Sequence, residues 1–70
     1  MFLNLENELR KHHLTKRAYA KFLNISNKTL FNKMNGITDF TLKEMKRSIN
    51  FISSETPLTI DYLFEWQNEL

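Results

Sequence analysis

The chain has 70 residues, of which 41% are apolar, with one Gly, one Pro and no Cys. A chain of this length buries only about 60% of the surface that it exposes when unfolded, so we expect a single domain over residues 1–70 with one small core. The absence of Cys excludes disulfides and thiolate-bound metal as stabilising features. Because Gly, Pro and Val, which mark small β-domains, are nearly absent, the composition predicts an all-α fold.

The formal charge of +2 is unevenly distributed along the chain. Residues 1–47 hold all ten Lys and Arg but four acidic residues, which gives +6, whereas residues 48–70 hold four acidic residues and no Lys or Arg, which gives −4. A basic segment indicates a polyanionic partner. Nucleic acid is the first candidate, because neutralisation of its phosphates supplies most of the non-specific affinity of proteins for it. A solvated lysine-rich surface is the other interpretation, and charge alone does not separate the two.

Several function classes find no support in the sequence. The longest apolar run is three residues and the amino terminus turns acidic within six, so we expect neither a membrane span nor a signal peptide, and a cytoplasmic location. The pair His12 and His13 has no further His or Cys to complete a metal site, and adjacent helical residues point apart. A chain this small offers its carboxylates no cleft, so we expect no enzyme, no cofactor and no small-molecule substrate.

Helix signals recur in chain order. A first helix is expected over about Asn4–His12, with acidic residues near its start and basic residues near its end, as the helix dipole favours. Three further helices are expected to begin near residues 15, 26 and 41, each with a Ser or Thr cap between apolar residues: Thr15, Ser26 and Thr41. Thr41 also forms a capping box with Glu44.

Two more helical features complete the predicted fold. The helix after Thr41 runs to about Asn50, and its apolar residues recur at helical spacing and predict a face in the core: Leu42, Met45, Ile49 and Ile52. Residues 53–57 are expected to form a loop. Thr59 then caps a last short helix with three apolar residues on one side: Ile60, Leu63 and Phe64.

The most informative segment is residues 14–36, two short capped helices separated by a turn centred on Asn24, which is the layout of a helix-turn-helix. Ala20 is small where the two helices must approach closely. Asn24 suits a left-handed turn, and Gly36 lies where the second helix must stop, in a position that often requires positive φ. Four apolar residues are expected to hold the helices at a steep angle: Tyr19, Leu23, Ile25 and Leu30.

On these residues the chain resembles the lambda-repressor-like, Cro-type helix-turn-helix regulators of bacteriophages and their hosts, especially small phage switch proteins of low-GC Gram-positive bacteria. The shared pattern is Leu-Thr, an Ala five positions on, Leu, a turn residue, Ile-Ser, Thr-Leu and a terminal Asn-Gly, with further likeness in segments 38–44 and 60–65. The resemblance covers about residues 4–65. The chain departs from the pattern at Asn24, where Gly is usual, and at Phe31, where an exposed polar residue is usual.

The resemblance implies a five-helix DNA-binding domain that regulates phage or prophage transcription at the lysis–lysogeny switch, in the cytoplasm of a bacterial host. It implies a dimer on a pseudo-palindromic operator in double-stranded DNA, because one short helix contacts too few base pairs for useful specificity. The helix beginning at residue 26 would be the recognition helix, with these residues towards the major groove: Ser26, Asn27, Lys28, Phe31 and Asn32. Phosphate contacts are expected from four basic residues: Lys16, Arg17, Lys33 and Lys43.

Alternatives stay open for several of these residues. Asn pairs with adenine and Lys donates to guanine, whereas Phe31 offers only contact with thymine methyls or stacking, so an A·T-rich half-site is favoured. The same polar residues also suit an ordinary exposed helix, and Phe31 also suits packing on a neighbouring helix. The candidate dimer or partner surface lies in the carboxy-terminal part of the chain and consists of Tyr62, Phe64 and Trp66. Trp66 suits closure of the core equally well.

A second hypothesis keeps the fold and changes the partner. An exposed aromatic residue in the recognition helix suits a protein pocket, and a charge of only +2 suits weak autonomous DNA affinity. The chain would then be an antirepressor or modulator of repression that binds a partner phage repressor through the same helix and alters its DNA binding. Phe31 is the residue that motivates this hypothesis.

Overall fold

The computed structural model describes residues 1–52, 55 and 57–68, and within them the chain forms helices and no strands. The all-α prediction is confirmed. The helices are α1 Leu3–Lys11, α2 Lys16–Leu23, α3 Asn27–Met34, α4 Leu42–Ile52 and α5 Ile60–Leu63. The predicted loop over 53–57 falls mostly on residues 53, 54 and 56, which lie outside the described residues. None of the helices in the described ranges combines the length and hydropathy needed to cross a membrane.

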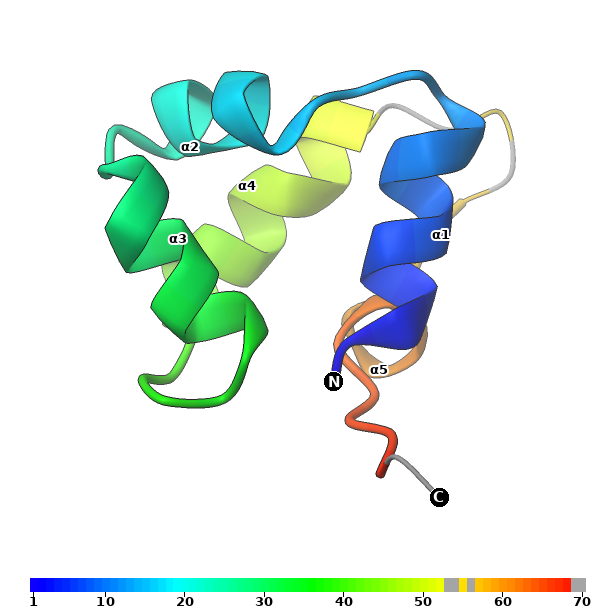
Figure 1. The fold of residues 1–70 in the computed structure, drawn as a ribbon. Helices are drawn as coiled ribbons and strands as arrows, with labels where there is room; N and C mark the ends of the chain where they lie inside the picture. Colours follow the sequence, from blue (N-terminus) through cyan, green and yellow to red (C-terminus); the bar gives the residue numbers. More distant parts are fainter. Residues whose placement is uncertain (53–54, 56, 69–70) are drawn as a thin grey trace.

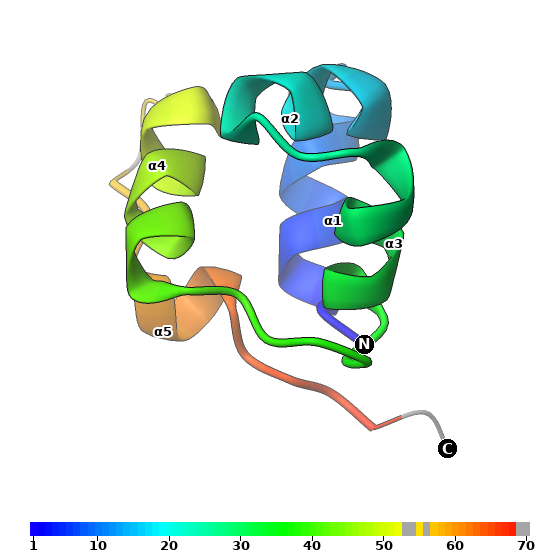
Figure 2. The same cartoon turned by 90° about the vertical axis from the view of Figure 1, so that its left-hand side faces the viewer.

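The helices are arranged around one core. Figures 1 and 2 show α2 across one end of the molecule and α5 towards the other, with α3 and α5 on opposite sides in both views. Helix α2 contacts α3 and α4, and α5 contacts α1 and α4. The buried apolar residues come from all five helices and from the loop before α4: Leu5, Leu9, Tyr19, Ala20, Leu23, Leu30, Met34, Phe40, Ile52 and Leu63.

The predicted helix caps are confirmed. In each cap the side-chain hydroxyl accepts a hydrogen bond from the backbone N–H of the residue three positions later, at 3.0–3.1 Å. The capping residues are Thr15, Ser26, Thr41 and Thr59. The capping box is complete, since the Thr41 backbone N–H donates to Oε1 of Glu44 at 2.8 Å. Local hydrogen bonding therefore sets where four of the helices begin.

Left-handed backbone sets where helices end. Asn24 has φ 60° and ψ 43°, as the turn prediction requires, and Gly36 has φ 76°. His13 also has a positive φ, 58°, which the sequence did not indicate. It ends α1, after which the backbone N–H of Leu14 donates to the carbonyl of Leu9 at 2.8 Å.

The predicted apolar face of α4 is only partly in the core. Ile52 is buried and Met45 and Ile49 are half-buried, but Leu42 is 59% exposed, so its assignment to the core face is wrong. Ser48 is fully buried and bonds to the Tyr19 hydroxyl at 2.5 Å. The buried face of α4 is thus rotated towards Ser48, and Leu42 lies at its margin.

The two ends of the described chain pack together. The amino group of Met1 donates to the carbonyl of Gln67 at 2.8 Å, and the Gln67 backbone N–H donates to the Met1 carbonyl at 2.9 Å. Beside them, four aromatic side chains meet edge to face at centroid distances of 4.9–5.9 Å: Phe2, Phe40, Phe64 and Trp66. This cluster ties the first residues to the loop between α3 and α4.

Candidate nucleic-acid interface

The local geometry of α2, the turn and α3 leaves one face of α3 outward. The left-handed Asn24 reverses the chain, and the Ile25 backbone N–H donates to the Ala20 carbonyl at 3.0 Å. Ala20 is 1% exposed at this close approach, as predicted. Leu30 and Met34 bury one side of α3 in the core, which turns the other side to solvent.

The predicted base-contacting residues divide by environment. Asn27, Lys28 and Phe31 are exposed, and Phe31 is 62% exposed, so it does not pack into the core. Asn32 is half-buried. Ser26 is exposed, but its hydroxyl accepts the Thr29 backbone N–H and donates to the Thr29 hydroxyl at 2.8 Å. Its observed contacts are those of a helix cap.

Two neighbouring hollows lie over α2, the turn and α3. The first, of about 420 Å³, follows the turn and is lined by Arg17, Lys21, Asn24, Ile25, Ser26 and Asn27. The second, of about 390 Å³, lies between the start of α2 and α3, and is lined by Lys16, Arg17, Asn27, Leu30, Phe31, Met34 and Asn35. Arg17 and Asn27 line both, so they lie between the two hollows.

The cations that line the two hollows come from α2. Arg17 and Lys21 are exposed. Lys16 is 62% exposed, and its ammonium is 3.0 Å from Oε1 of Glu6 on α1. An ion pair this exposed contributes little stability, so Lys16 can exchange Glu6 for a phosphate at small cost. Lys43 is exposed in the first turn of α4.

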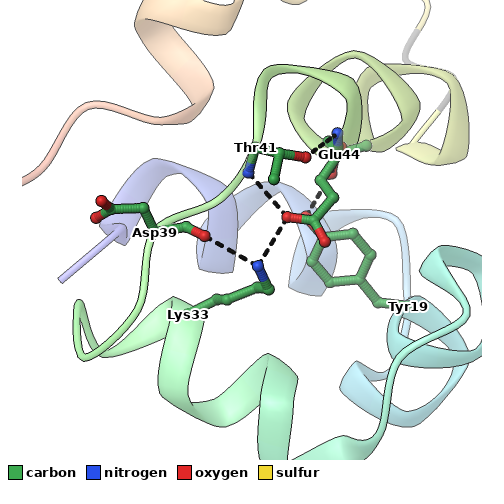
Figure 3. Close-up of polar contacts among 6 residues, drawn as sticks. Tyr19, Lys33, Asp39, Thr41 and Glu44 are labelled. Carbon is green, nitrogen blue, oxygen red and sulfur yellow. Dashed lines mark hydrogen bonds and ion pairs between the residues drawn. The ribbon is translucent and has the colours of Figure 1, made fainter.

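The prediction that Lys33 contacts phosphate is wrong. The residue is only 9% exposed, and its ammonium donates to Oε1 of Glu44 at 2.9 Å and to the Asp39 carbonyl at 2.9 Å (Figure 3). Burial raises the pKa of Glu44, but hydrogen bonds from Thr41 and Lys33 outweigh it and the pKa is lowered. Lys33 therefore joins α3 to the start of α4.

The predicted carboxy-terminal surface is partly withdrawn from solvent. Phe64 is half-buried against Phe2 and Phe40, so it offers less surface to a partner than its neighbours Tyr62 and Trp66. Tyr62 is 43% exposed and its hydroxyl donates to Glu8 at 3.1 Å, which raises the pKa of Tyr62. Trp66 is 47% exposed, with its ring on Phe2 and Gly36.

Sequence reasoning missed three residues that line the hollows. Lys21 lies four residues after Arg17, on the same face of α2, and that spacing was visible in the sequence. Asn24 was assigned only a turn role. Asn35 lines the second hollow, and its side-chain amide donates to the Phe31 carbonyl at 2.8 Å. Nothing in the sequence alone indicated that contact.

The described residues contain no cluster of three or more His, Cys, Asp or Glu that could hold a metal ion. Comparisons with protein-family models, with curated proteins and with solved structures find no match for this chain.

Proposed function

We propose that the chain is a helix-turn-helix DNA-binding regulator, Cro-like in its mode of action, that acts on phage or prophage transcription. One observation carries the proposal: three cations of α2 and the exposed Asn27 of α3 line the two neighbouring hollows, and within the described part of the chain no acidic residue lines either of them. Polyanionic DNA is the partner that this charge suits. In this proposal α3 enters the major groove, and four cations contact phosphates: Lys16, Arg17, Lys21 and Lys43.

The dimer expected from the resemblance belongs to the same proposal. A single α3 contacts too few base pairs for useful specificity, so two copies would bind half-sites one turn of duplex apart. Tyr62 and Trp66 remain the candidate dimer contacts, because both are nearly half exposed and neither lines the two hollows. Phe64, which is half-buried beside them, would add its remaining exposed surface to the same contact.

Selection of duplexes from a random library by the purified protein, at two salt concentrations, tests the proposal. We expect an enriched pseudo-palindrome that survives the higher salt. Asn27→Ala should weaken binding to the selected duplex by about 1–3 kcal/mol, since Asn pairs with adenine. It should also relax the base preference at one position of the motif. Asn7→Ala, at an exposed Asn on α1, is the matched control and should change nothing. A folded protein that enriches no motif would contradict the proposal.

The antirepressor function is the second candidate, and the exposure of Phe31 favours it. An aromatic side chain 62% exposed on a helix suits a hydrophobic pocket of a partner repressor. Phe31→Ala should then abolish partner binding and leave general DNA affinity unchanged. Leu42→Ala is the matched control, because Leu42 is 59% exposed on another helix. A changed operator preference with no partner effect would instead support the regulator.

A further inference from the structure

The second hollow has an apolar interior and a polar rim. Leu30 is 2% exposed and Met34 5% exposed, so they form its floor, and Phe31 adds an exposed aromatic wall. Asn27 and Asn35 from α3 and the following turn, and Lys16 and Arg17 from α2, complete the lining: Lys16, Arg17, Asn27, Leu30, Phe31, Met34 and Asn35. Its occupant must therefore present a small apolar group within a polar, anionic surface.

Thymine in duplex DNA has this chemistry. In the major groove it exposes a C5 methyl group, the apolar feature of the base-pair edges, with phosphates on both sides. The cations at the start of α2 complement those phosphates, and Asn27 beside the hollow can pair with an adenine edge.

We propose that this hollow recognises the C5 methyl of thymine, with Phe31 as the specificity-determining contact. The inference rests on the proposed function and goes beyond it, because it names the chemical group that α3 selects. Phe31, which departs from the polar residue usual at its position, then has a role in DNA recognition. The Asn35 amide, bonded to the Phe31 carbonyl at 2.8 Å, holds the backbone beneath that contact.

Replacing thymidine by deoxyuridine tests the inference, because it removes only the methyl group. Each thymine of the selected duplex is replaced in turn, and the Kd is measured for the wild-type protein, Phe31→Ala and Leu42→Ala. We expect one thymine in each half-site at which deoxyuridine weakens wild-type binding about fourfold. Phe31→Ala should bind the two duplexes equally, whereas Leu42→Ala should behave like the wild type.

A second arm adds the methyl group instead of removing it. With cytosine at that position, 5-methylcytosine should bind wild-type protein about fourfold tighter than cytosine, and Phe31→Ala should not distinguish them. A selected motif with no deoxyuridine effect at any thymine would overturn the inference and leave the proposed function standing. Enrichment of no motif would overturn both. Equal deoxyuridine effects in wild type and Phe31→Ala would overturn the role of Phe31.

Discussion

A side chain at position 36 would meet the indole of Trp66. A Cβ on Gly36 would lie 2.7 Å from Cη2 of that ring, and the backbone there has a left-handed φ of 76°. Gly36→Ala should therefore lower the free energy of unfolding by about 1–3 kcal/mol, from backbone strain and steric overlap. Urea unfolding measures it. In Gly36→Ala/Trp66→Ala the ring is gone, so the combined loss should be smaller than the sum; additive losses would contradict the contact.

The Lys33–Glu44 pair makes stability depend on pH. The pKa of Glu44 is lowered in the folded state, so the unfolded chain binds a proton more readily and the stabilisation is lost as pH falls through the folded pKa. At pH 7, Glu44→Gln should be about 1.5–3 kcal/mol less stable than wild type. That difference should shrink below about pH 4. Urea unfolding from pH 7 to pH 3 measures it, and a constant difference would contradict the assignment.

At the scale of single elements, the left-handed ends of α1 and α2 differ in how well their residues suit them. Asn adopts this conformation more readily than His, so His13, at φ 58°, is the more strained of the two. His13→Gly should raise the free energy of unfolding by about 0.5–1 kcal/mol. His12→Gly is the matched control. His12 has φ −96°, so the same change there should lower the free energy of unfolding by a similar amount. Thermal unfolding compares them, and destabilisation by both would contradict the account.

Element boundaries were predictable because their causes are local. A cap hydroxyl and the backbone N–H that donates to it lie three residues apart, and Asn24 and Gly36 each carry their own backbone preference. The place of Lys33 was not predictable, because its partner Glu44 is eleven residues away and already serves the capping box through the same oxygen. The exposure of Leu42 was not predictable either, since it depends on how distant helices pack.

At the scale of the whole molecule, charge is separated in space as well as in sequence. The cations of α2 line the hollows beside α3, whereas α5, which carries Asp61, lies on the side opposite α3 (Figures 1 and 2). Exposed charges separated by more than about 10 Å are largely screened at 0.1 M salt. Only acidic groups close to the basic face should therefore oppose DNA binding.

Glu6 is such a group, through its 3.0 Å pair with Lys16. Glu6→Gln should raise DNA affinity by about two- to fivefold at low salt, because it releases Lys16 to contact a phosphate. The number of counterions released on binding, read from the slope of affinity against salt, should rise by up to about one. Fluorescence anisotropy across a salt series measures both. Glu65→Gln, near α5, is the control and should have a smaller effect; equal effects would contradict the placement of the interface.

The central claim is that DNA meets the face formed by α2, the turn and α3. Titration of the isotope-labelled full chain with its selected duplex, followed by backbone amide chemical shifts, tests it most directly. We predict the largest shifts over residues 16–36, above all at Arg17, Asn27 and Phe31, with small shifts in α5. Largest shifts in α5 or on the outer face of α4, with α3 unperturbed, would contradict the claim.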